Sequence, residues 1–150
     1  MTEILFYHLQ GVGPESVLPT LLSRTIERGW RAIVQVGSPE RAEALDAHLW
    51  TFSDDSFLPH GIDKERDAAS QPILLTAGDG NLNGGQVRFL TDNAPLPSDV
   101  EAYARVVLLF DGEDSDALDH ARAAWSEAKG GGHAVTYWQQ DENGRWQQRG

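Results

Sequence analysis

The chain has 150 residues, a length that fits one compact domain and leaves little room for a second. It holds 12 Lys and Arg against 23 Asp and Glu, a formal net charge of −11 that is spread evenly over both halves. This charge argues against direct binding of nucleic acid, which needs a surplus of Lys and Arg, and against an anionic membrane surface as partner. The lack of cysteine excludes disulfides, cysteine nucleophiles and thiolate metal sites.

The amino-terminal residues carry no basic segment ahead of their short apolar run, and no stretch approaches 18 apolar residues. We therefore expect neither a signal peptide nor a membrane span, and a cytoplasmic protein. Five tryptophans are many for this length. They predict either a large aromatic core or exposed anchors for protein partners.

Apolar runs alternate with segments of helical period along the chain. Buried strands are expected at residues 4–9, 32–36, 72–76, 86–91 and 105–110. Helices are expected at residues 14–28, from Pro39 to about residue 50, at 95–104 and from 115 to 129. The apolar stripe of the second helix consists of Ala42, Leu45, Leu49 and Trp50.

The remaining segments are expected to be loops and a hairpin. Residues 51–71 show neither period and predict a long loop, and the glycines at 78–85 predict a flexible turn region. Residues 133–139 and 145–149 predict a hairpin with Asn143-Gly144 at its turn. The alternation predicts one α/β domain over residues 1–150, with a mostly parallel sheet covered on both faces and an antiparallel C-terminal hairpin.

The segment Gly11-Val12-Gly13-Pro14-Glu15-Ser16 lies where a dinucleotide-binding fingerprint would lie, between the first strand and the first helix. The third glycine is replaced by Ser16, and Pro14 removes an amide that would face a phosphate. No acidic residue follows the second strand to hold a ribose. An ordinary turn is the favoured interpretation, and a nucleotide-binding enzyme on a Rossmann-like fold is kept as the alternative.

Other residues give no support for catalysis or for a bound metal or cofactor. None of the five histidines has the spacing of a zinc site. The acidic segment 111–116 lacks the Gly and Glu of a calcium loop and is better explained as the start of a helix. We therefore expect no catalytic, cofactor-binding or metal-binding residues.

Two clusters are candidates for binding proteins. The first places Trp50, Phe52, Phe57, Leu58 and Pro59 in or beside one loop, where they form either core or a docking surface.

The second cluster is Arg122, Trp125 and Lys129, which lie on one face of a helix at i, i+3 and i+7. Together they can hold a carboxylate and an aromatic side chain. The other interpretation makes Trp125 a core residue with two cations at its edge, and from the residues alone it is favoured.

Several short segments occur in an order and at distances that resemble a known family. They are Phe6-Tyr7, Leu45-Asp46, Leu49-Trp50, Ser56-Phe57-Leu58-Pro59-His60, Gln71-Pro72, Ala121-Arg122 and Tyr137-Trp138-Gln139-Gln140. The chain resembles, over essentially its whole length, the chi subunit of bacterial DNA polymerase III holoenzyme.

The resemblance implies a single Rossmann-like three-layer domain without an active site of its own. It implies an accessory role in DNA replication, in which the protein links the clamp loader to single-stranded-DNA-binding protein. One surface would bind the acidic C-terminal tail of that protein, which ends in Pro-Phe. A second, largely apolar surface would bind the psi subunit of the clamp loader or, exclusively, a helicase.

By position, the resemblance assigns the tail site to Arg122, Trp125 and Lys129. Arg122 would clamp the terminal carboxylate, Trp125 would form a wall for the last Phe, and Lys129 would face the acidic stretch. It assigns the second surface to Trp50, Phe57 and Pro59. Ser126 and Leu118 occupy positions that are cationic in some relatives, so this tail site is less basic and a lower affinity is expected.

Overall fold

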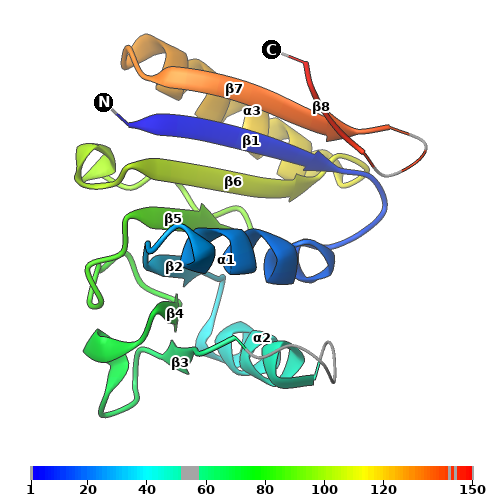
Figure 1. Ribbon diagram of the computed structural model, residues 1–150. Coiled ribbons are helices and arrows are strands. Elements are labelled where there is room, and N and C mark those ends of the chain that lie inside the picture. Colours follow the sequence, from blue (N-terminus) through cyan, green and yellow to red (C-terminus); the bar gives the residue numbers. More distant parts are fainter. Residues whose placement is uncertain (1, 52–57, 142, 144, 150) are drawn as a thin grey trace.

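The computed structural model describes residues 2–51, 58–141, 143 and 145–149, which are built around one eight-stranded sheet. The strands lie in the order β3-β4-β2-β5-β6-β1-β7-β8, and all neighbours pair in parallel except β7 and β8 (Figure 1). Their bounds are β1 Glu3–Leu9, β2 Ala32–Gln35, β3 Gly61–Ile62, β4 Ile73–Thr76, β5 Val87–Leu90, β6 Arg105–Asp111, β7 Ala134–Gln140 and β8 Trp146–Gln148.

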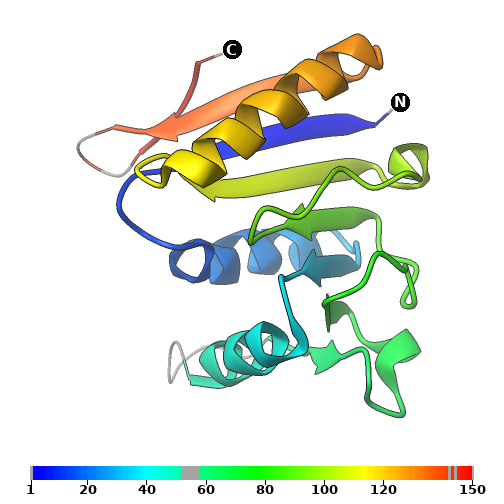
Figure 2. The ribbon, with the colours of Figure 1, turned by 180° about the vertical axis from the view of Figure 1, so that it is seen from behind.

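Helices cover the sheet from both sides. Helices α1 (Leu18–Glu27) and α2 (Pro39–Thr51) lie over one face, and α3 (Ser115–Gly130) lies over the other (Figures 1 and 2). Three short 3-10 helices complete the elements: η1 Pro14–Ser16, η2 Ala68–Ser70 and η3 Val100–Ala102. The predicted fold class, with its antiparallel C-terminal hairpin, is confirmed.

The alternating faces of the strands divide the core into two apolar clusters. In β1, Leu5 and Tyr7 belong to the cluster under α1 and α2, while Ile4 and Phe6 belong to the one under α3. Successive side chains of a strand point to opposite faces, so a strand buried on both sides is apolar at nearly every position. This explains why the apolar runs located the central strands correctly.

Helix α1 covers only part of its face. It packs in front of the middle of the sheet and stops short of the β7–β8 hairpin, as Figure 1 shows. The residues of β7 from Val135 to Gln140 are accordingly half-buried, whereas those of β6 from Val106 to Phe110 are buried. A hollow lined by residues of α1 and of the hairpin lies on this face.

The first predicted helix, residues 14–28, is regular only in its later part, as Pro19 within it suggests. The chain forms the separate turn η1 and restarts as α1 at Leu18, so that Pro19 falls in the first turn of the new helix. A continuous helix would place the Pro19 ring against the carbonyl four residues earlier. Proline in a first turn avoids that clash and lacks only an amide that would have had no partner.

Two other segments also differ from expectation. The predicted loop 51–71 contains strand β3 and turn η2, which are too short to produce a periodic pattern. The helix predicted at 95–104 is only the single turn η3. Residues 52–57, within the predicted loop, lie outside the described residues.

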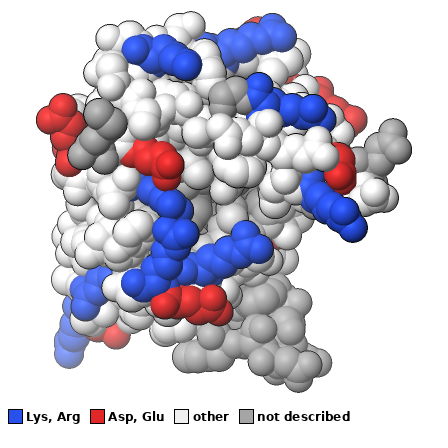
Figure 3. Space-filling model, turned by 45° about the horizontal axis from the view of Figure 1, so that its top comes forward, with Lys and Arg blue, Asp and Glu red and all other residues white. Residues whose placement is uncertain are grey.

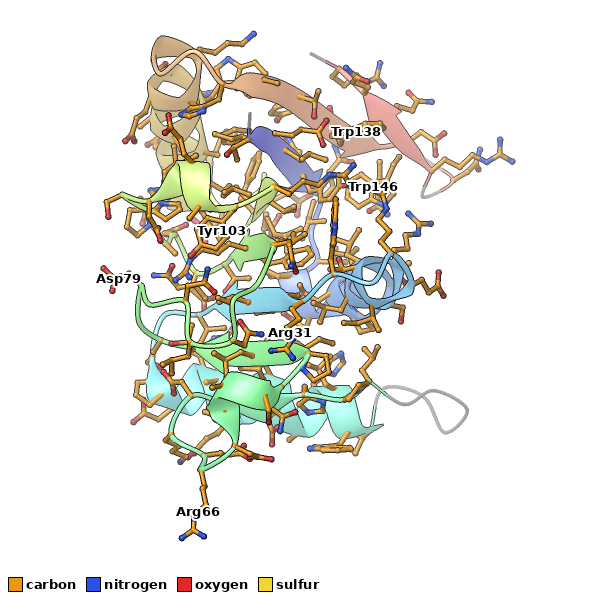
Figure 4. The ribbon with its side chains drawn as sticks, turned by 60° about the vertical axis from the view of Figure 1, so that its left-hand side comes forward. Arg31, Arg66, Asp79, Tyr103, Trp138 and Trp146 are labelled. Carbon is orange, nitrogen blue, oxygen red and sulfur yellow. The ribbon has the colours of Figure 1, made fainter. Side chains whose placement is uncertain are left out.

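The first two glycines of the predicted turn region at 78–85 are held by the buried side chain of Arg88. Its guanidinium donates to the carbonyls of Gly78 and Gly80 at 2.8 and 2.9 Å and to Oε1 of Gln35 at 2.8 and 3.1 Å. It also donates to the Tyr103 hydroxyl at 3.1 Å, on the side of the molecule where Figure 4 shows Tyr103 and Asp79. Arg88 has no exposed surface, so these acceptors replace its solvation.

Candidate protein-binding sites

The candidate tail site lies on α3, and we call Arg122, Trp125 and Lys129 the α3 surface. Asp114 caps the helix, since its carboxylate accepts hydrogen bonds from the amides of residues 116 and 117. The buried face consists of alanines: Ala117, Ala121, Ala124 and Ala128. These small side chains let the helix approach the sheet closely, so larger residues at its edge reach both the core and the solvent.

Trp125 occupies such an edge position and is half-buried. Its ring meets Phe6 edge-on at a centroid distance of 5.3 Å and Tyr137 at 5.8 Å. The Lys129 ammonium lies 5.1 Å from the centre of the indole ring, a cation–π contact. Trp125 is thus fixed by the core on one side and stays partly exposed on the other.

Arg122 is exposed one turn before Trp125 and forms no ion pair with a described residue. Its charge acts on Tyr137: burial raises the pKa of the Tyr137 hydroxyl, and Arg122 partly opposes that rise. The structure brings together all three residues of the α3 surface.

His8 and Tyr137 extend this surface, and the motif argument did not assign them to it. Nδ1 of His8 and the Tyr137 hydroxyl share a hydrogen bond, and the His8 ring stacks 5.0 Å from that of Phe110. Burial lowers the pKa of His8 below its ordinary value of 6.5, and Asp111 only partly opposes this. Strand parity is the signal that was available, because it puts His8 on the same face as Phe6.

The second candidate surface lies at the end of α2, and we call Trp50 and Pro59 the α2 surface. Trp50 is 50% exposed, and its ring lies 4.4 Å from that of His60. His60 is buried, with Nδ1 2.6 Å from the Leu58 carbonyl and Nε2 3.1 Å from the Asp46 carboxylate. His60 thereby fastens the segment that carries Pro59 to α2 and brings it beside Trp50.

The prediction that Trp50 belongs to the apolar stripe of α2 is wrong. Leu45 and Leu49 are buried, whereas Trp50 lies one residue, and so about 100°, around the helix from Leu49 and faces outward. Leu58 is also core, at 5% exposure, while Pro59 is half-buried. Phe57, the third residue assigned to this surface, lies outside the described residues.

The Gly11–Ser16 segment is surrounded by carboxylates where a phosphate would lie in a dinucleotide-binding fold. The amide of Gly11 donates to Oδ1 of Asp111 at 3.0 Å. A Cβ atom at Gly11 would lie 2.9 Å from the Glu113 carboxylate, and one at Gly13 would lie 2.5 Å from that of Glu15. These negative charges repel a phosphate and count against the nucleotide-binding alternative.

Within the described part of the chain, no three His, Asp or Glu side chains are placed to hold a metal ion. No described helix is both long and apolar enough to cross a membrane.

The fold is that of a Rossmann-like α/β protein, and each of its two candidate sites carries a partly or fully exposed tryptophan. The family model described as "DNA polymerase III chi subunit, HolC" matches residues 1–136. The chain therefore belongs to the chi subunit family, a family of accessory subunits of DNA polymerase III.

Two curated relatives agree with this assignment. The DNA polymerase III subunit chi of Pseudomonas aeruginosa is 32% identical over 116 residues, which cover 73% of this chain and 77% of the relative. The probable DNA polymerase III subunit chi of Rickettsia prowazekii is 23% identical over 117 residues, which cover 74% and 71%. The family predicted from the sequence is thus confirmed.

Proposed function

We propose that this chain links the clamp loader of DNA polymerase III to single-stranded-DNA-binding protein, without catalysing a reaction. The α3 surface binds the acidic C-terminal tail that ends in Pro-Phe. The α2 surface, together with Phe57, binds a second protein, either the psi subunit or a helicase. Membership of the chi family and the geometry of the α3 surface support this proposal.

The observation that carries the proposal is the arrangement of Arg122 beside Trp125. An exposed guanidinium can grip a terminal carboxylate through two parallel hydrogen bonds. The indole, held by Phe6 and Tyr137, offers a fixed wall to an aromatic side chain at little cost in conformational entropy. Lys129, already attracted to the indole ring, adds positive charge for the residues that precede the terminal Phe.

The charge of the whole protein limits the strength of this complex. An acidic tail approaches a chain of net charge −11, but screening at physiological salt confines that repulsion to about 8 Å. Local contacts with Arg122 and Lys129 then decide the outcome. We expect a weak complex that forms and dissociates quickly.

Calorimetric titration with a synthetic acidic peptide ending in Pro-Phe tests the tail site. Arg122→Ala should lower the affinity by at least about tenfold, since a charge-assisted contact contributes about 1.5–3 kcal/mol. Arg66→Ala is the matched control, because Arg66 extends from the far end of the molecule (Figure 4). Equal affinity for a peptide that lacks the terminal Phe would show that the assigned site is wrong.

Copurification from the native host tests the second surface. Trp50→Ala should remove one partner protein while leaving retention on an immobilised tail peptide unchanged. The exposed indole can be removed with little cost to folding, because the core face of α2 is formed by other residues. If the same proteins copurify with the wild type and with Trp50→Ala, the α2 surface has a different role.

A further inference from the structure

The hollow between α1 and the C-terminal hairpin is the starting point. It has a volume of about 340 Å³ and lies on the face of the sheet opposite α3. Residues of α1, of β1 and β6, and of the hairpin line it, among them Trp138 and Gln148. These two lie beyond residues 1–136, so the family match covers only the start of the hairpin wall.

The charge around this groove is opposite in sign to that of the chain. Arg24 and Arg28 reach it from α1 and Arg105 from β6, while Glu3 is the acidic residue in its lining. Glu3 pairs with Arg105 at 2.8 Å, which leaves the two exposed arginines of α1 for a ligand. In Figure 3, Lys and Arg side chains gather beside a hollow near the middle of this face.

A phenol hydroxyl adds a neutral donor to these cations. Burial raises the pKa of Tyr7, and its hydroxyl lies within the field of Arg105, Arg24 and Arg28. The phenol therefore stays protonated at neutral pH. No described residue forms a hydrogen bond with this hydroxyl that competes with a ligand in the groove.

Aromatic rings supply the other half of the groove. Tyr7, Trp30 and Trp138 line it, and Trp146 packs against Tyr7 at a centroid distance of 4.8 Å. Figure 4 shows Trp138 and Trp146 in the space between the hairpin and α1.

Two of these rings are held in place before any ligand arrives. The indole nitrogen of Trp138 donates to the Thr136 hydroxyl at 3.0 Å. The guanidiniums of Arg28 and Arg105 lie 5.4 and 5.5 Å from the Trp30 ring. Binding would therefore cost little side-chain ordering.

We propose that this groove binds a short single strand of nucleic acid, with phosphates on Arg24 and Arg28 and bases against Tyr7 and Trp138. Cations that follow a backbone, combined with aromatic rings on which bases stack, are the chemistry of single-strand binding. An acidic peptide without aromatic residues would use the arginines but leave the aromatic walls without a function. A volume of about 340 Å³ restricts the contact to one or two nucleotides at a time.

The net charge of −11 excludes an extended interface but not this local one. Screening limits the repulsion to about 8 Å at physiological salt, so the groove acts largely through its own charges. Binding is accordingly weak and falls steeply as salt is added.

Fluorescence anisotropy of a labelled oligothymidine of twelve nucleotides, titrated with the full chain at several salt concentrations, tests the proposal. With two phosphate contacts, the logarithm of the binding constant should fall against that of the salt concentration with a slope of about −1.4. The double variant Arg24→Gln/Arg28→Gln should bind about tenfold more weakly and lose most of that slope. Arg66→Gln, a single neutralisation at a distant site, should retain both.

Three results would overturn the proposal. They are no binding at 50 mM salt, an equal loss in Arg66→Gln, and displacement of the oligonucleotide by a Glu-rich peptide whose own affinity depends on Arg24 and Arg28. The last result would assign the groove to an acidic protein segment instead. Because Arg122→Ala affects only the tail peptide and Arg24→Gln/Arg28→Gln only the oligonucleotide, either site can fail without the other.

Discussion

The α3 surface and the groove lie on opposite faces of the same two strands, and adjacent residues build them. In β1, Phe6 supports Trp125 on the α3 side, while Tyr7 lines the groove. In β7, which pairs with β1, Tyr137 faces α3 and Trp138 faces the groove.

Helix α3 covers one face of these strands, whereas α1 stops short of the hairpin on the other face, and this accounts for the difference between the two regions (Figure 1). On the α3 side, the aromatic rings pack into the core and a single wall is offered to a ligand. On the groove side, the same kinds of ring line a hollow that arginines border. The composition of the chain predicts neither region. The local charge of each depends on which elements place their Lys and Arg side chains there.

The largest effect is expected from a change in the sheet that both regions share. Arg88→Met leaves the carbonyls of Gly78 and Gly80 and the Gln35 amide oxygen without their donor in a buried site. We expect the free energy of unfolding to fall by about 3 kcal/mol. Urea denaturation measures it, and the folded fraction should still bind both ligands normally. If the folded variant bound only one of the two ligands, Arg88 would support one region and not the other.

Trp125→Ala should affect binding at the α3 surface and leave binding in the groove unchanged. The substitution removes the wall of the α3 surface and the ring contacts of Trp125 with Phe6 and Tyr137. We therefore expect about 2 kcal/mol of destabilisation and loss of tail-peptide binding. Titration of the same variant with the oligonucleotide should give the wild-type constant. A parallel loss of oligonucleotide binding would mean that the sheet transmits the change.

Lys129→Gln tests the weaker cation of the α3 surface. The ammonium contributes a partly exposed cation–π contact and charge for the acidic tail, together about 0.5–1 kcal/mol. We expect the affinity for the tail to fall by about two- to fivefold, which corresponds to that free energy. The loss should shrink at high salt, and a loss independent of salt would point to packing instead of charge.

The smallest effect is a pH dependence on the α3 side. Because the pKa of His8 is lowered in the folded protein, the unfolded chain takes up a proton first as the pH falls below about 6.5. Stability should therefore decline between that pH and the lower pKa of folded His8. Thermal unfolding at pH 7.5 and at pH 5.5 should show a smaller difference for His8→Gln than for the wild type, and equal differences would exclude His8 as the source.

Apolar runs and helical periods predicted most of the strands and helices. A parallel sheet covered on both faces needs apolar residues at nearly every strand position. The segments that differ from the prediction are broken by a proline, are too short to show a period, or are held by a specific side-chain contact. Arg88 in β5 donates hydrogen bonds to the glycine-rich turn that precedes this strand, and no local sequence pattern predicts that contact.

The candidate sites divide in the same way. Helical spacing was enough to bring Arg122, Trp125 and Lys129 together, since they share one helix. The groove joins α1, β6 and a hairpin from distant parts of the sequence, so only the three-dimensional structure reveals it. Trp50 shows a further limit, because an aromatic residue next to a buried leucine is easily assigned to the same stripe.

The way Arg88 is bound also determines how the protein responds to acid. Its acceptors are carbonyls, an amide oxygen and a phenol, and none of these takes up a proton when carboxylates do. The surface ion pairs Arg41–Asp92 and Arg105–Glu3 depend on carboxylates instead. The contact that holds the 78–80 turn against β5 is therefore independent of carboxylate charge, unlike those pairs.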